Sequence, residues 1–255
     1  MTGGAAALWL DPLPVVAPAL RLLCLPPAGA GARFFQDWRR YAPGWLQLCP
    51  VRPPGRDGRI DEPAGGTLAG LAASVAAAVA ELDATDPLPL AVFGHSMGGL
   101  LGYELTPLLR DAGVTVRHLF VSATPTPGPR WARAVLAGIV DPTAFLRRLG
   151  GTPAELWQHP ELRDLVVATT TADLRTLARH TPGRHAVPCP VSVFQGWDDP
   201  LAGPSDLAWW RERTGSPPSE RVFPGGHFYC LDDPAGIVAA VSVALSAPVT
   251  APTGR

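Results

Sequence analysis

The 255-residue sequence contains no lysine and no asparagine, and isoleucine is rare. We attribute these absences to the codon bias of a very GC-rich genome, so by themselves they carry no functional meaning. The missing lysine still excludes sites whose chemistry needs its amine. A phosphate-binding loop of the G-K-[ST] type, a Schiff base and a Ser-Lys dyad are all excluded.

Cysteine is scarce and charge is nearly balanced. The four cysteines lie far apart without any C-x-x-C spacing, so we expect neither a metal site nor a redox pair. Cys24, Cys49 and Cys189 lie in or beside apolar runs, which predicts buried thiols. A net charge of −1 gives no electrostatic attraction to nucleic acid or to an anionic membrane, and we expect neither as a partner.

Long apolar runs are absent as well. No run approaches the roughly 18 residues of a membrane-spanning helix, and Ala5–Leu10 is too short for the apolar region of a signal peptide. No basic residue precedes Arg21. These features favour a cytoplasmic protein. A hydrophobic content of 47% and a charged content of 17% are typical of a well-packed globular chain, and we predict a single domain over residues 1–255.

Short apolar runs alternate with helical stretches, a pattern typical of a mostly parallel sheet covered by helices on both faces. The predicted fold class is therefore α/β. The predicted strands are Leu20–Leu25, Gln47–Val51, Leu88–Phe93, Val114–Ser122, Val191–Gln195 and Glu220–Phe223. The predicted helices are Leu68–Leu82, Met97–Ala112, Leu207–Thr214 and Pro234–Leu245, and a loose tail is expected over 247–255.

The regular spacing is broken once, between Ser122 and Val191. The intervening segment is rich in proline and arginine and has helical patches at 132–139, 142–149, 153–157 and 160–177. So long a connection inside a compact domain is usually functional, and we predict a helical lid inserted over residues 125–187. The alternative is a plain helical decoration of the sheet.

The segment Gly94-His95-Ser96-Met97-Gly98 follows the central predicted strand and precedes a predicted helix. A G-x-S-x-G sequence between a strand and a helix is typical of a nucleophile elbow. The sharp turn would bring side chains two positions before and after the serine into collision, and glycine removes the Cβ at both. We therefore predict that Ser96 is a nucleophile, although a simple glycine-flanked turn has the same pattern.

A serine nucleophile needs an acid and a base, which follow it along the chain in this kind of fold. Of the six histidines, only His227 lies in a loop after the last predicted strand, and it is the predicted general base. The loop after Val191–Gln195 contains both Asp198 and Asp199. Successive residues point in different directions, so only one can reach the histidine, and the pattern alone leaves both open.

The negative charge that forms during attack on a carbonyl needs two N–H donors. We expect one of them from Met97, the residue after the serine. The other is expected from the glycine-rich loop that follows the first predicted strand, Leu20–Leu25. Pro26 and Pro27 have no N–H, so Ala28 is the first residue of that loop that can donate.

Together these motifs resemble the type II thioesterases, the free-standing editing thioesterases of polyketide and nonribosomal peptide synthesis, which have the α/β-hydrolase fold. The likeness covers about residues 20–245. The matching segments are Leu25–Gly29 for the oxyanion loop, Pro54–Arg59 for a P-G-R-x-x-R segment, Leu146–Pro153, Pro160–Leu162 and Ala172–Arg175 for the lid, and Gly196–Pro200 and Gly225–Phe228 for the acid and base motifs. One departure is Ala30, where the family commonly has a second glycine.

The resemblance implies a function. Its substrate would be an acyl thioester on the phosphopantetheine arm of an acyl or peptidyl carrier protein, which would be a transient partner of a monomeric enzyme. By the same likeness, Asp199 would be the acid that orients His227, and no metal or bound cofactor would be needed. A small-molecule esterase of the same fold and a non-catalytic binding protein are the alternatives.

Overall fold

The computed structural model describes residues 4–246, apart from the side chains of residues 204 and 205. The loose tail expected over 247–255 lies outside the described residues. The chain forms one six-stranded sheet in the order β2-β1-β3-β4-β5-β6, and every neighbouring pair of strands is parallel. The α/β fold class is therefore confirmed. The strands are β1 (Leu20–Leu25), β2 (Leu46–Pro50), β3 (Leu90–His95), β4 (Val116–Ser122), β5 (Val191–Gly196) and β6 (Ser219–Phe223).

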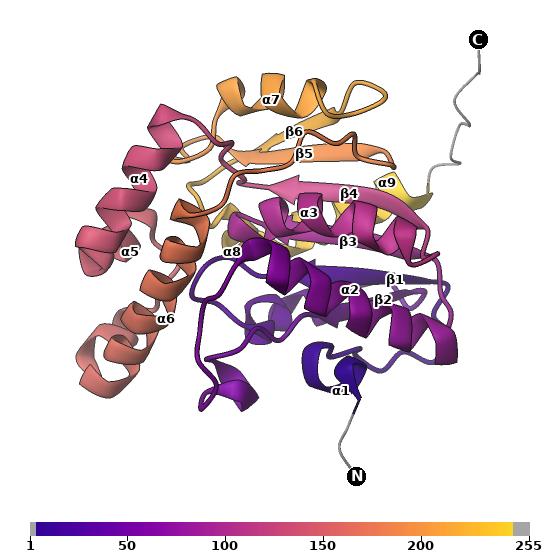
Figure 1. Cartoon of the computed structure of the whole chain (residues 1–255), viewed down its shortest axis with the longest axis horizontal. Helices are drawn as coiled ribbons and strands as arrows, with labels where there is room; N and C mark the ends of the chain where they lie inside the picture. The colour runs from indigo at the N-terminus through magenta and orange to yellow at the C-terminus, as the bar shows by residue number, and fades with distance from the viewer. Residues whose placement is uncertain (1–3, 247–255) are drawn as a thin grey trace.

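Apolar runs form the central strands because both faces of this sheet are covered. Every residue of β1, β2 and β3 is buried, including the side chains that point to opposite faces. One apolar core lies against α2 (Leu68–Thr85) and α3 (Met97–Asp111), and the other lies against the 3₁₀ helix η1 (Ala32–Arg40) and α9 (Pro234–Ser246). Figure 1 shows α2 and α3 in front of the sheet and α9 behind it.

Among residues 4–246, α2 is the one helix that is long and apolar enough to cross a membrane. Its composition has another explanation in this fold. The helix packs beside α3, and Leu71, Val75 and Val79 enter the core in front of the sheet. An alanine-rich core helix passes the same length and hydropathy test as a membrane span.

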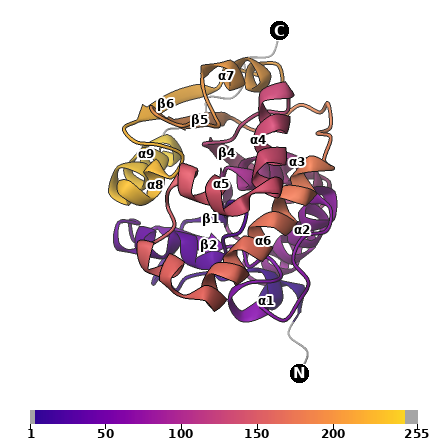
Figure 2. The same cartoon turned by 90° about the vertical axis from the view of Figure 1, so that its left-hand side faces the viewer.

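The long connection between β4 and β5 folds into four helices. Prolines at or near the first helical position begin α4 (Pro129–Val140), α5 (Pro142–Leu149) and α6 (Pro160–Ala178), with the 3₁₀ helix η3 (Ala154–Gln158) before α6. We refer to residues 129–178 as the insertion. It covers the end of the sheet at which the parallel strands finish, as the turned view in Figure 2 shows.

Several short elements were not predicted. They are α1 (Ala5–Trp9), η1, the 3₁₀ helix η2 (Asp57–Arg59) and α8 (Tyr229–Asp232). Most span too few residues to show a hydrophobic period, and η1 is not α-helical. The predicted helix Leu207–Thr214 was placed too late, because α7 begins at Pro204, a proline in its first turn, and ends at Arg211.

Candidate active site

The elbow holds Ser96 in a conformation that few residues adopt. Its φ of 55° and ψ of −114° lie outside the regions that side-chain-bearing residues normally occupy. A hydrogen bond stabilises the turn: the Ser96 N–H donates to the carbonyl of Ser122, at the end of the neighbouring strand β4, at 2.8 Å. A Cβ at Gly94 would collide with the Gly98 carbonyl, and one at Gly98 would collide with the Leu25 carbonyl. The two glycines therefore permit the close backbone approach that exposes the serine.

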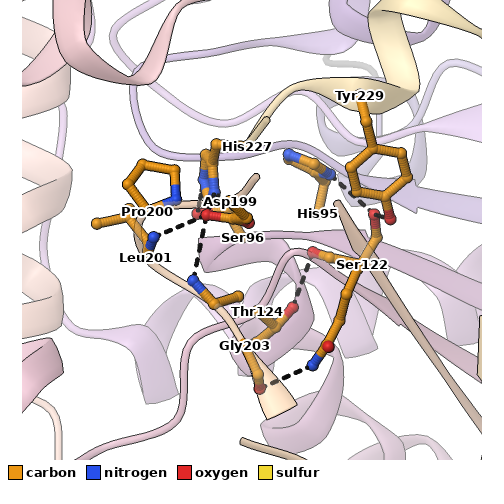
Figure 3. Close-up of polar contacts among 12 residues, drawn as sticks. His95, Ser96, Ser122, Thr124, Asp199, Pro200, Leu201, Gly203, His227 and Tyr229 are labelled. Carbon is orange, nitrogen blue, oxygen red and sulfur yellow. Dashed lines mark hydrogen bonds and ion pairs between the residues drawn. The ribbon is translucent and has the colours of Figure 1, made fainter. Parts of the chain in front are cut away.

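Three predicted side chains meet at the carboxyl ends of the strands (Figure 3). Ser96 Oγ lies 3.0 Å from His227 Nε2. The other ring nitrogen, His227 Nδ1, lies 2.9 Å from Asp199 Oδ2 and 3.1 Å from Oδ1. His227 is 1% exposed, which shields this chain of hydrogen bonds from water. The arrangement is that of a nucleophile, a base and a group that orients the base.

The loop after β5 distinguishes the two aspartates that the sequence left open. Asp199 is buried at 9% exposure, whereas Asp198 is exposed. Asp199 Oδ1 also accepts N–H groups from Leu201 at 2.8 Å and Ala202 at 3.2 Å. These two bonds fix the carboxylate against the loop, so that it faces His227 rather than solvent.

Both predicted oxyanion donors border the serine. Met97 is the first residue of α3, so its N–H has no acceptor within the helix. Ala28 lines the same pocket as Ser96 and His227. Within residues 4–246, neither of these two N–H groups has a hydrogen-bond acceptor. Both N–H groups are therefore free to donate to a ligand.

A buried ion pair holds the loop that carries Ala28. Asp173 on α6 is 1% exposed and accepts the Gly29 N–H at 2.8 Å. Its carboxylate also accepts two bonds from the Arg56 guanidinium, at 2.5 and 3.1 Å. Arg56 in turn donates to the Ala30 carbonyl at 3.2 Å. Two residues from separate segments, Arg56 and Asp173, thus hold the loop at Gly29 and Ala30, directly after Ala28. The sequence analysis identified the segments Pro54–Arg59 and Ala172–Arg175, but it did not predict this contact. Nothing in the sequence pattern pairs residue 56 with residue 173.

A pocket of roughly 550 Å³, including its open mouth, begins at Ser96 and runs under the insertion. Its walls are mostly aliphatic and aromatic. The insertion contributes Trp131, Ala134, Val135, Phe145, Leu146, Leu149, Thr170, Leu174 and Leu177. Such a pocket suits an apolar chain attached to a carbonyl at the serine.

A second histidine lies behind the elbow and was not assigned a role by the sequence. His95 is fully buried, and its Nδ1 lies 3.0 Å from Ser122 Oγ, which is 2.6 Å from the Tyr229 hydroxyl. Burial, and secondarily the nearby charge of His227, lowers the pKa of His95 well below its usual value. The ring centroids of His95 and His227 lie 5.4 Å apart.

The chain matches known thioesterases over most of its length. A family model of the thioesterase domain covers residues 20–244. Thioesterase PikA5 of Streptomyces venezuelae is 34% identical over 238 residues, which span 89% of this chain and 82% of PikA5. The AMB antimetabolite synthetase AmbE of Pseudomonas aeruginosa is 35% identical over 235 residues, a match that spans 89% of this chain but only 11% of AmbE.

A solved structure gives the same picture. BorB, described as the type II thioesterase from the borrelidin biosynthetic cluster, superposes with a TM-score of 0.80 at 30% identity. The superposition covers 93% of this chain and 98% of BorB. The likeness therefore extends over the sheet and the insertion together.

Proposed function

This chain belongs to the thioesterase family, and we propose that it hydrolyses acyl thioesters on the phosphopantetheine arm of carrier proteins in polyketide or nonribosomal peptide synthesis. One observation carries this proposal: Ser96, His227 and Asp199 form an unbroken chain of hydrogen bonds that opens into an apolar pocket. The insertion acts as the lid of that pocket. The related type II thioesterase BorB supports the assignment to biosynthesis.

Acylation begins at Ser96. His227 Nε2 takes the proton as Ser96 Oγ attacks the thioester carbonyl carbon, and Asp199 stabilises the imidazolium that results. The N–H groups of Met97 and Ala28 hold the carbonyl oxygen while it carries negative charge. The C–S bond then breaks, His227 protonates the leaving pantetheine thiolate, and the acyl group remains on Ser96.

Hydrolysis of the acyl-enzyme repeats these steps with water. His227 takes a proton from a water molecule as the water oxygen attacks the ester carbonyl, and the same two N–H groups hold the oxyanion. The bond to Ser96 Oγ breaks, Ser96 recovers its proton from His227, and the free acid leaves. All the groups required come from one chain, so we propose that a monomer is sufficient. The four free thiols are in keeping with the proposed cytoplasmic location.

The test compares substrates. The protein is given the same acyl group as a carrier-protein thioester, as a short pantetheine thioester and as a simple oxygen ester. We expect the highest kcat/KM on the carrier-bound thioester. A preference for the oxygen ester would favour a small-molecule esterase, and no turnover of any of the three would favour a binding protein.

The ion pair behind Ala28 leads to a prediction about the oxyanion. Asp173→Asn should lower kcat on a short pantetheine thioester by about tenfold to a hundredfold, with little change in KM. The amide can still accept the Gly29 N–H, but it leaves the buried Arg56 charge unpaired. The loop should therefore shift, and the Ala28 N–H should no longer point at the oxyanion. The measurements are kcat, KM and the melting temperature Tm.

A neighbouring ion pair provides the control. Arg59 is also buried and lies 2.5 Å from Glu62, but neither residue contacts the oxyanion loop. Glu62→Gln makes the same change from acid to amide and should leave kcat close to wild type. An equal loss of kcat in the two variants would show that Asp173 contributes only general stability.

The insertion and the short segments beside it have the charge to attract an acidic carrier protein. Residues 126–185, which include the insertion, contain eight arginines and five acidic residues. One of those five, Asp173, is buried against Arg56, which lies outside the insertion, so the exposed surface is more basic than the count suggests. Arg147 and Arg148 are both exposed, on α5. Carrier proteins are typically acidic around the pantetheine serine, so opposite charge would steer docking.

We predict that Arg147→Glu combined with Arg148→Glu lowers kcat/KM for an acyl-carrier protein by about tenfold at low salt, and less at moderate salt. The same acyl group on a short pantetheine thiol should react as in wild type. Arg39→Glu with Arg40→Glu, another adjacent exposed pair outside the insertion, controls for net charge. Equal losses on both substrates, or equal losses in both double variants, would remove these arginines from carrier recognition.

A further inference from the structure

One threonine of α6 differs from the other three. Thr169, Thr171 and Thr176 each donate a hydrogen bond to the carbonyl four residues earlier in the helix. The Thr170 hydroxyl makes no such bond, and within residues 4–246 it has no hydrogen-bond partner at all. The residue is 1% exposed. A buried hydroxyl without a partner is costly. The Thr170 oxygen has almost no accessible surface and packs against Gly29, so a ligand would meet it only after the side chain turns toward the pocket.

The Thr170 hydroxyl lies beside the oxyanion loop. A Cβ at Gly29 would collide with Thr170 Oγ1, so the glycine leaves the space that the hydroxyl needs. Gly29 directly follows Ala28, the proposed second donor to the oxyanion. Thr170 and Ala28 both line the pocket that begins at Ser96.

The rest of the pocket offers little to a polar group. Among its lining residues, Ser96, His227 and Thr170 carry the only hydroxyl or imidazole groups, and the first two belong to the proposed reaction centre. Beyond them the wall is formed mainly by side chains such as Phe145, Leu146 and Leu174. An oxygen on the acyl chain that enters this wall would find two side-chain groups outside the reaction centre, the hydroxyl of Thr170 and the indole N–H of Trp131, and of these only the hydroxyl can also accept a hydrogen bond.

We propose that Thr170 determines acyl specificity by hydrogen-bonding an oxygen on the first few carbons of the acyl chain, such as a β-hydroxyl or β-keto oxygen. The hydroxyl can donate to a ketone and can accept from an alcohol. A plain hydrocarbon chain leaves Thr170 unpaired and is therefore bound less well in the transition state. This role rests on the proposed thioesterase function and names the class of acyl group that the pocket prefers.

The experiment measures a ratio of kcat/KM values. The substrates are butanoyl, 3-oxobutanoyl and the two 3-hydroxybutanoyl thioesters of N-acetylcysteamine, and the variants are Thr170→Val, Thr170→Ser and Thr169→Val. Wild type should prefer the ketone or one of the alcohols over butanoyl. Thr170→Val should reduce that preference by about tenfold, and Thr170→Ser should retain it. Thr169→Val loses a buried hydroxyl outside the pocket and should keep the wild-type ratio.

Other outcomes would overturn this role. Wild type without any preference for an oxygenated chain excludes the contact. Equal loss on all substrates in Thr170→Val, with or without a lower Tm, assigns the hydroxyl to packing or to the water step. If wild type hydrolyses neither the butanoyl thioester nor an acyl-carrier thioester, the proposed function is overturned, and the Thr170 role falls with it. If it hydrolyses only the carrier-bound thioester, the same ratio is measured with the four acyl groups loaded on the carrier.

Discussion

Replacing Ser96 by alanine should lower kcat for an acyl thioester by at least about a thousandfold and leave Tm nearly unchanged. The hydroxyl is the proposed nucleophile, and its one side-chain hydrogen bond is to His227 Nε2. Alanine adopts the strained backbone at this turn no less readily than serine does. Steady-state hydrolysis and thermal unfolding of the same preparation give both quantities.

Ser122 supplies a matched serine for that experiment. It lies at the end of the next strand, and its hydroxyl joins His95 to Tyr229 in a fully buried cluster behind the elbow. Ser122→Ala should give the opposite result, a protein less stable by about 1–3 kcal/mol that retains most of its turnover. Near-normal activity in a folded Ser96→Ala variant would remove the serine mechanism.

The second large effect is expected at the acid. Asp199→Asn should lower kcat by three to four orders of magnitude, on the scale of about 10⁴ found for this change in a serine protease triad. The amide holds His227 in the wrong tautomer and cannot stabilise the imidazolium. Asp198→Asn, one residue away and exposed, should change kcat by less than about threefold.

The pair of variants is informative because the chemical change is the same in both. Both lose one negative charge from the same loop, so a general electrostatic effect on the site would lower kcat in each. The contact with His227 differs, since only Asp199 lies within 3.1 Å of the ring. If Asp198→Asn were the more damaging change, the acid would have to be reassigned to Asp198.

The sequence predicted the sheet well because its signals are local. A parallel strand buried on both faces reads as a short apolar run, and glycines at 94 and 98 mark the turn around Ser96. Boundaries were less accurate, and β4 begins at Val116 rather than Val114. Where an element ends depends on hydrogen bonds to neighbouring strands, which the pattern does not contain.

Contacts between distant segments could not be predicted in the same way. The choice between Asp198 and Asp199 depends on which carboxylate accepts hydrogen bonds from the backbone N–H groups of residues 201 and 202. The pairing of Arg56 with Asp173 depends on how α6 crosses the oxyanion loop, and no period in either segment encodes it. In the sequence, Thr170 is one of four similar threonines. Only the structure shows that its hydroxyl lacks the hydrogen bond to a helix carbonyl that the other three make.

The bond between Asp173 and the oxyanion loop limits how the pocket can open. A rigid-body movement of α6 away from the oxyanion loop would break the buried ion pair between Asp173 and Arg56. Breaking such a pair costs about 3–5 kcal/mol. Fewer than about one molecule in a hundred would adopt that shape at any moment. The helices α4 and α5 have no ion pair to the sheet within residues 4–246, and they are held instead by apolar contacts such as those of the buried Trp131 and Val135. We therefore expect extra bulk on the acyl chain to be tolerated better beside α4 and α5 than beneath α6.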